Sequence, residues 1–327
     1  MRFGFPVPTC REGRDNLTGF VKPKDIIKLS QECERLGFYA IWGNDFINPP
    51  KASLKKFNPP PAWYEIVTSF AAIAVATQKI KLGIGVIVMP FREPVMLTKQ
   101  VMTVDHFSNG RVLFGLGLGG SRDEFLSLQP KMTKAHRGNM LDEGLEAVKR
   151  LLNDTNASFD GQYYAFKEVS LYPRTVQKPL PIYVAGHGDT TPERVAKYAQ
   201  GWLVSYPSLD DLHHRWKEME EAMEKEKRSM SELDVVVSWG MSLAKTREKA
   251  LERFKKSLQG GKERPADWYS KNNLIGSPAE VAEFISGFEK AGATHCIPLH
   301  IAADTMPEIE EQMHMFAEEV MPLVKKG

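Results

Sequence analysis

The sequence of 327 residues has only three cysteines, Cys10, Cys33 and Cys296, and they stand far apart. No pair has the spacing of a zinc site, and three scattered thiols do not form a disulfide framework. Neither sign of charge is in excess, because 43 Lys and Arg residues balance 41 Asp and Glu residues. Nucleic acids and membrane surfaces attract proteins with a basic surplus. We therefore expect neither as a partner, no bound metal, and a cytoplasmic location.

Long apolar runs are also missing. The most apolar stretches, residues 67–77 and 84–90, are shorter than the about 20 residues that a membrane-spanning helix needs. The apolar N-terminus is too short for a signal peptide. The motifs of zinc proteases, serine hydrolases and P-loop enzymes do not occur. We therefore expect a soluble protein, and zinc proteolysis, serine-hydrolase chemistry and P-loop phosphate transfer lack support.

Extended and helical patterns alternate along the chain. We predict eight strands, at residues 2–8, at 38–45, within 79–94, within 112–125, and at 181–185, 201–206, 233–243 and 294–301. Helical patterns separate them, at residues 21–37, 64–77, 97–111, 135–152, 191–200, 209–230 and 277–292. Strands that alternate with crossover helices form a parallel sheet. Eight such units favour an α/β fold of the (β/α)8 TIM-barrel type, with an open doubly wound sheet as the alternative.

We expect residues 1–327 to form one barrel domain with insertions at about 46–63, 155–178 and 255–275. The first insertion is so rich in proline that we expect no regular structure there. The second is rich in aromatic and β-branched residues, and we predict a small hairpin. The insertions are expected at the C-terminal face, where the active sites of such barrels lie.

Glycines stand inside the third and fourth strands. The third strand contains Gly83 and Gly85, and the fourth contains Gly115, Gly117, Gly119 and Gly120. Glycine weakens a strand, so its use there indicates that another backbone or a ligand comes close. We interpret the pattern as room for a flat ligand, with barrel packing as the alternative. The run GLGLGG matches the dinucleotide fingerprint poorly, because a strand rather than a strand-to-helix turn contains it.

The stretch AGHGDTTPERVA, residues 185–196, predicts an anion site. Gly186 and Gly188 allow a tight turn after the fifth strand, and Thr190 or Thr191 can cap the helix that follows. Thr190 and Glu193 have the spacing of a capping box. Free N–H groups at a helix start favour a phosphate, although an ordinary capped helix would carry the same residues.

Two polar residues, Asn44 and Asp45, end the second strand in the phrase WGNDF. They would emerge at the carboxyl face of a barrel, where they could contact a cofactor or shuttle a proton. A plain turn is the alternative. His300 ends the eighth strand at the same face and is a weaker candidate. Arg111 precedes the fourth strand and is expected to be structural at the opposite face.

The phrases LGFYAIWGND, IKLGIGVIVMPFREP, VLFGLGLGGSRDEF and IYVAGHGD resemble, in order and spacing, the bacterial luciferase-like superfamily of flavin- and deazaflavin-dependent oxidoreductases. The resemblance implies a TIM-type barrel with a tricyclic ring at its carboxyl end, and a homodimer. It implies a cis peptide at Gly85–Val86 behind the ring. The other residues that it assigns to the cofactor are Leu118 and Gly119 beside the ring, and His187, Gly188, Thr190 and Thr191 beside the phosphate. Asn44 and Asp45 match the polar, catalytic pair.

The resemblance further implies an enzyme that uses coenzyme F420 for hydride transfer or reduced FMN as a monooxygenase. The pattern leans to the deazaflavin, and the substrate is an unidentified small organic molecule. Relatives that oxidise sugar phosphates carry Asp-His after the second strand and a Glu after the fourth, where this chain has Asp45-Phe46 and Gly120. A non-catalytic flavin-binding barrel and a nicotinamide-dependent dehydrogenase are the alternatives.

Overall fold

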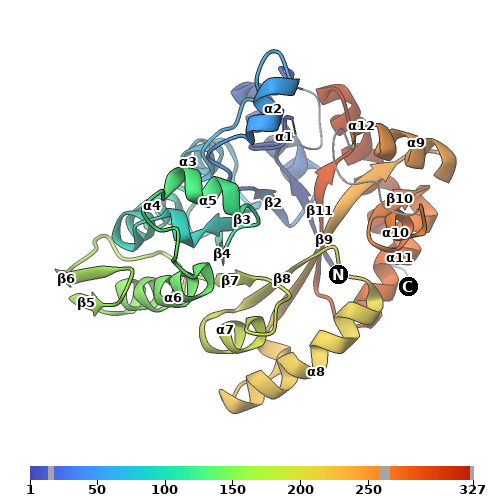
Figure 1. Ribbon diagram of the computed structural model, residues 1–327. Helices are drawn as coiled ribbons and strands as arrows, with labels where there is room; N and C mark the ends of the chain where they lie inside the picture. Colours follow the sequence, from blue (N-terminus) through green and yellow to red (C-terminus); the bar gives the residue numbers. More distant parts are fainter. Residues whose placement is uncertain (14–17, 258–265, 325–327) are drawn as a thin grey trace.

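The computed structural model describes residues 1–13, 18–257 and 266–324 (Figure 1). Eight parallel strands form the barrel: β1 (Arg2–Pro6), β2 (Ala40–Gly43), β3 (Lys81–Val88), β4 (Val112–Gly117), β7 (Ile182–Ala185), β8 (Gly201–Ser205), β9 (Asp234–Leu243) and β11 (His295–Ile301). β1 lies between β2 and β11, and the ring closes where β8 pairs with β9. The predicted barrel is confirmed, and the open sheet is wrong because no barrel strand is left at an edge.

Helices cover the outside of the barrel between consecutive strands (Figure 1). They are α1 (Pro23–Arg35), α3 (Ile66–Ala76), α4 (Pro94–Phe107), α6 (Arg137–Asn153), α7 (Thr191–Tyr198), α8 (Leu209–Lys225), α9 (Arg247–Ser257), α11 (Pro278–Lys290) and α12 (Met306–Met315). α9 and α12 are not among the helices predicted from the sequence. Both carry many charges, which hide the narrow apolar stripe that each buries.

α11 shows how the sequence forms these helices. Ser277 and Glu280 form a capping box, in which the Glu280 carboxylate accepts the Ser277 N–H at 2.8 Å. Val281, Ile285 and Phe288 recur on one helical face, and all three are buried. Burying each such side chain contributes about 1.5–3 kcal/mol, which holds the helix against the barrel.

A separate apolar cluster fills the inside of the barrel. Its members come from six strands and are Ala40, Trp42, Leu113, Tyr183, Leu203, Val236 and Ile297. Trp42 is the largest, and a Cβ added at Gly83 would lie only 2.2 Å from its indole ring. At Gly4 the same distance would be 2.7 Å. These two glycines therefore make room for the indole, and the flat-ligand interpretation of Gly83 is wrong.

Short elements lie in the segments between the barrel units. In the first insertion a helix, α2 (Lys51–Lys56), forms against our expectation, because its prolines flank the helix rather than enter it. The helix α5 (Arg122–Leu128) occupies part of the loop that follows β4, where Ser121 caps it by accepting the Glu124 N–H.

The second insertion forms the predicted hairpin, β5 (Ala157–Asp160) paired with β6 (Ala165–Val169), which extends beside α6 (Figure 1). The third insertion contains α10 (Ala266–Lys271) and β10 (Leu274–Gly276), and β10 pairs with β9 outside the ring. The rest of that insertion, residues 258–265, lies outside the described residues. Among the described helices, none has the length and apolarity that crossing a bilayer requires.

Candidate active site

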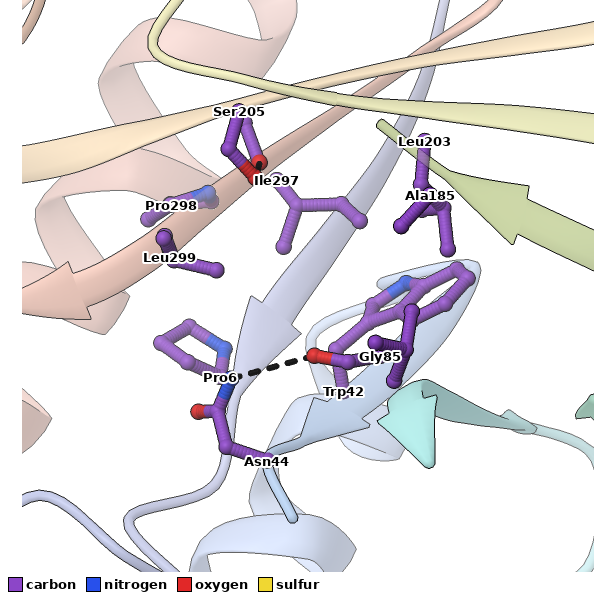
Figure 2. A pocket seen from close by; sticks show the side chains of 12 residues that line it. Pro6, Trp42, Asn44, Gly85, Ala185, Leu203, Ser205, Ile297, Pro298 and Leu299 are labelled. Atoms are coloured by element: carbon purple, nitrogen blue, oxygen red, sulfur yellow. Dashed lines mark hydrogen bonds between the residues drawn. The ribbon is translucent and has the colours of Figure 1, made fainter. Parts of the chain in front are cut away.

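A cavity of about 460 Å³, part of it open to solvent, lies at the carboxyl ends of the barrel strands (Figure 2). Residues of seven strands or of the segments that directly follow them line it. The lining residues are Pro6, Trp42, Asn44, Gly85, Val86, Ala185, Leu203, Ser205, Ser238, Ile297, Pro298 and Leu299. The active sites of such barrels lie at this face. The cavity is thus the candidate active site.

The cavity has apolar walls. The Trp42 indole packs edge-on against Tyr183, with ring centroids 5.9 Å apart, and separates the cavity from the barrel interior below. Ala185 and Ile297 provide further apolar surface around it (Figure 2). Val86 adds to this surface. The lining set contains no charged side chain. Such a surface suits a planar, largely apolar ring better than a highly charged ligand.

Asn44 is the polar side chain on the β2–β3 side of this cavity. Its amide nitrogen donates to the carbonyl oxygen of Gly85 at 3.1 Å, and its backbone N–H donates to Thr9 Oγ1 at 3.2 Å. The Gly85–Val86 peptide bond is cis, in agreement with the resemblance. The amide nitrogen is directed to Gly85, and the side-chain oxygen points away from it (Figure 2). Asn44 can therefore position the Gly85 backbone and offer one acceptor to a ligand.

The structure places Asp45 behind the cavity wall. Its side chain is fully buried, with one oxygen accepting the Val88 N–H at 3.0 Å and the other paired with Arg92. Arg92 also contacts Glu65 at 3.3 Å. Burial raises the pKa of Asp45, and the neighbouring Arg92 opposes that rise. Because both oxygens are engaged away from the cavity, Asp45 fixes the end of β3, and its catalytic role stays a prediction without a contact to support it.

The predicted phosphate loop follows β7 directly from the cavity-lining Ala185. The Thr191 N–H donates to the Gly188 carbonyl at 2.9 Å, and Gly186 has a positive φ of 150°. From His187 to Thr190 the loop is exposed, and no described group accepts from its backbone N–H groups. A Cβ added at Gly188 would meet nothing within 4 Å. The loop thus has open donors, and its phosphate role stays a prediction.

The predicted capping box of α7 is wrong. Thr190 is the N-cap residue, but its backbone has helical angles, with φ −86° and ψ −4°, and its side chain makes no capping hydrogen bond. An N-cap side chain reaches the N–H groups of the first turn from an extended backbone. The helical angles turn the Thr190 hydroxyl away, which leaves those N–H groups for another acceptor.

Leu118 and Gly119 lie outside the cavity lining. Their carbonyl groups accept from Arg137 at 3.4 and 2.9 Å, and Gly119 has a left-handed φ of 75°. A Cβ added at Gly115 would lie 2.0 Å from the Ile84 carbonyl oxygen, and one at Gly117 would lie 2.7 Å from Val86. Gly115 and Gly117 of β4 therefore allow β3 to approach. This agrees with barrel packing, the alternative to a flat ligand at these glycines. Of the residues predicted to bind the cofactor, only Gly85 and Val86 line the cavity.

The other side of the cavity holds residues that were not predicted from the sequence. Ser205 at the end of β8 and Ser238 within β9 line it, and their hydroxyl oxygens lie 3.2 Å apart. A serine inside each of two otherwise apolar strands was the available signal. Arg111 was correctly expected to be structural, because its buried guanidinium donates to the carbonyl oxygens of Ala74 and Ile80. No group of three His, Cys, Asp or Glu in the described part of the chain could hold a metal.

A closed barrel of eight parallel strands with a cavity at their carboxyl ends is the architecture of TIM-type enzymes. Residues 1–295 match the family described as luciferase-like monooxygenases, and the chain belongs to this family. The resemblance drawn from the sequence is thereby confirmed.

Known relatives cover nearly the whole chain. The F420-dependent glucose-6-phosphate dehydrogenase of Amycolatopsis mediterranei (strain U-32) is 25% identical over 93% of this chain and 95% of its own. The FMNH(2)-dependent dimethylsulfone monooxygenase of Pseudomonas putida is 24% identical over 91% of this chain and 87% of its own. The crystal structure of the monooxygenase RslO1 from Streptomyces bottropensis shares the fold, with a TM-score of 0.82 and 22% identity over 98% and 99% of the two chains. The chain is thus an oxidoreductase of a family with F420- and FMNH(2)-dependent members.

Proposed function

We propose that this oxidoreductase binds coenzyme F420 and transfers a hydride between it and a small organic substrate. Monooxygenation with reduced FMN is the alternative. The observation that carries the proposal is the cavity, where Asn44 and the cis peptide at Gly85–Val86 form one wall at the carboxyl ends of the strands. The F420-dependent relative, which aligns over 93% of this chain, supports the choice of the deazaflavin.

The residues present suit such a cofactor. Val86, Ala185 and Leu203 offer apolar contacts to a tricyclic ring, and the Asn44 side-chain oxygen offers an acceptor. The N–H groups of residues 187–190 would hold a phosphate, because no described group uses them and the α7 dipole favours an anion. A bound deazaflavin supplies the hydride chemistry itself. The protein then binds the ring, orients it and excludes water from it.

Two positions argue against the sugar-phosphate chemistry of the F420-dependent relative. Phe46 stands where such enzymes carry a histidine, and its ring packs on Trp63 with centroids 5.5 Å apart. Gly120 stands where they carry a glutamate, and a Cβ added there would meet nothing within 4 Å. Neither position offers a group that can take or give a proton. The substrate therefore differs from a sugar phosphate, or another part of the cavity provides the acid–base group.

Cofactor titration tests the proposal. Purified protein is titrated with F420 and, separately, with FMN in oxidised and reduced form, and binding is followed by cofactor fluorescence. We expect F420 to bind at micromolar concentration and Asn44→Leu to weaken that binding. Lys178→Ala, an exposed residue remote from the cavity, is the matched control and should bind as the wild type does. Binding of reduced FMN alone would select the alternative, and binding of neither cofactor would overturn the proposal.

A further inference from the structure

A second cavity, called the basal cavity below, lies at the opposite end of the barrel from the candidate active site. Its volume is about 1020 Å³, part of it open to solvent. It lies at the amino ends of two strands, because Ile182 begins β7 and Gln200 directly precedes β8. The last turns of α6 and α7 form further walls. The lining residues are Lys149, Leu152, Asn153, Thr175, Gln177, Lys178, Pro179, Leu180, Ile182, Lys197, Tyr198, Gln200 and Arg228.

The basal cavity is strongly basic. Its described lining contains no Asp or Glu and four cations, which are Lys149, Lys178, Lys197 and Arg228. The whole chain has a formal net charge of +2, so these charges gather at one place instead of following the average composition. Among the described residues, Arg228 pairs with Glu232 at 3.4 Å, whereas none of the three lysines forms an ion pair. The positive potential of the basal cavity should therefore attract anions.

Two of the four cations also have a structural use. Helix C-termini carry a partial negative charge, which favours cations in the last turn. The Lys149 ammonium donates to the Lys197 carbonyl oxygen at 3.3 Å, and Arg228 Nη1 donates to the Ala196 carbonyl oxygen at 2.7 Å. Both carbonyl groups belong to the last turn of α7. Lys178 lies outside the helices, in the segment before β7, and donates to no described carbonyl oxygen. Helix capping therefore does not account for it.

The floor of the basal cavity combines a free donor with apolar surface. Gln200 Oε1 accepts the Ile182 N–H at 2.9 Å, while no described group accepts from Gln200 Nε2. The Ile182 side chain and the Tyr198 ring are both buried. The ammonium groups of Lys149 and Lys197 lie 5.4 and 4.9 Å from the centroid of the Tyr198 ring. Such contacts hold an ammonium group in place and leave its charge intact.

We propose that the basal cavity binds a small organic anion in which two or more negative charges are joined to an apolar group. The exposed lysines hold the anionic end at the rim, because a phosphate or carboxylate group accepts charge-assisted hydrogen bonds from several donors. Leu152, Leu180 and Ile182 contact the apolar end. The basal cavity shares no lining residue with the active-site cavity, so the inference does not depend on the cofactor that binds there.

Calorimetric titration of the full-length protein tests this inference. The buffer contains about 150 mM KCl, which screens isolated surface charges. The probes are isopentenyl diphosphate, inorganic diphosphate and isopentenol, which separate the contribution of the charges from that of the apolar group. We expect isopentenyl diphosphate to saturate one site at submillimolar concentration, inorganic diphosphate to bind more weakly, and isopentenol not to bind.

Lysine variants locate the site. Lys178→Ala and Lys197→Ala should each weaken the binding of isopentenyl diphosphate by about 10-fold, as the loss of one charge-assisted hydrogen bond does. Lys178→Arg keeps the charge and should bind more tightly than Lys178→Ala. Lys217→Ala changes an exposed lysine of α8 outside the lining and should bind as the wild type does. Lys149 and Arg228 are left unchanged because they bond to the end of α7.

The outcomes can be told apart from those of the cofactor titration. Lys178→Ala should lose affinity for the diphosphate and keep its affinity for F420. The inference is wrong if neither diphosphate saturates a site at millimolar concentration, or if Lys217→Ala loses as much affinity as the other two alanine variants. It is also wrong if F420 displaces the diphosphate, because the anion would then occupy the active site. Equal affinities for the two diphosphates would contradict the apolar part of the assigned ligand.

Discussion

The two sides of the cavity are built on different principles. On the β2–β3–β7 side, Asn44, Gly85, Val86 and Ala185 present backbone and small or apolar side chains, and the polar contact there joins an amide to the backbone. On the β8–β9–β11 side, the Ser205 and Ser238 hydroxyl groups lie 3.2 Å apart in the cavity lining. One side suits a flat ring, and the other offers hydroxyl groups to a polar part of a ligand. An apolar wall can follow from the pattern within each strand, whereas a pair of hydroxyl groups forms only where two neighbouring strands place serines side by side.

Trp42 lies below both sides, so its removal should have the largest effect. Trp42→Ala would leave a large void in the barrel interior, because the indole packs on Tyr183 and fills the space beside Gly83. Truncating a large buried aromatic side chain typically costs about 3–5 kcal/mol. We expect a loss of this size in urea unfolding, together with loss of F420 binding. If Trp42→Ala weakened F420 binding without lowering the free energy of unfolding, Trp42 would contact the cofactor without stabilising the barrel interior.

His295, which packs against Trp42 below the cavity, should make the free energy of unfolding depend on pH. It is fully buried, and no described group bonds either ring nitrogen. Burial, with a smaller contribution from Arg2, lowers the pKa of His295 from 6.5 to about 3. Between pH 6.5 and 3, His295 is therefore protonated in the unfolded chain but neutral in the folded protein. The free energy of unfolding keeps its full value above pH 6.5 and decreases as the pH falls toward 3. Between pH 7.5 and 5.0 this linkage costs about 2 kcal/mol.

The measurement compares the wild type with His295→Phe in urea unfolding at both pH values. Phenylalanine fills a similar volume without a titrating group, so the variant should lose about 2 kcal/mol less than the wild type over this range. His214→Gln, which changes an exposed histidine, should follow the wild type. Equal losses in the wild type and in His295→Phe would contradict the assignment.

Gly83 and Gly188 compare the two uses of glycine. A Cβ at Gly83 would lie 2.2 Å from the Trp42 ring, while one at Gly188 would meet nothing within 4 Å. Overpacking a closed interior typically costs about 1–3 kcal/mol. We expect Gly83→Ala to lose stability in this range and Gly188→Ala to stay within about 0.5 kcal/mol of the wild type, as surface substitutions do. Thermal or urea unfolding measures both, and a stable Gly83→Ala would restore the ligand interpretation of that glycine.

Substitution of Asn44 should have the smallest effect. We expect it to weaken F420 binding, whereas a substitution on the β8–β9–β11 side of the cavity should not. Asn44→Leu removes the bond to the Gly85 carbonyl and the amide group of this cavity-lining residue. Loss of such a bond typically costs about 1–2 kcal/mol, which corresponds to roughly 10-fold weaker F420 binding. Ser238→Ala, on the polar side, should leave F420 affinity unchanged in the same titration. Equal losses in the two variants would mean that the ring contacts both sides.

Much of the barrel could be predicted, because each strand is a short apolar run and each helix has its own apolar face and caps. The cis peptide at Gly85–Val86 and the place of Asn44 followed from the family's phrases. Asp45 did not: residue spacing cannot show that both its oxygens turn away to Val88 and Arg92. The glycines of β4 were assigned to a ligand because their true neighbours, the Ile84 carbonyl beside Gly115 and the Val86 side chain beside Gly117, belong to another strand.

The sequence by itself determined the order of strands and helices, because hydrophobic periodicity and capping act between residues a few positions apart. It also determined that the carboxyl ends of the strands meet at one face. Only the tertiary structure decided which side chains share the cavity. Ser205 and Ser238 are 33 residues apart and meet in its lining because β8 pairs with β9. Barrel closure sets such distances, and no local pattern records them.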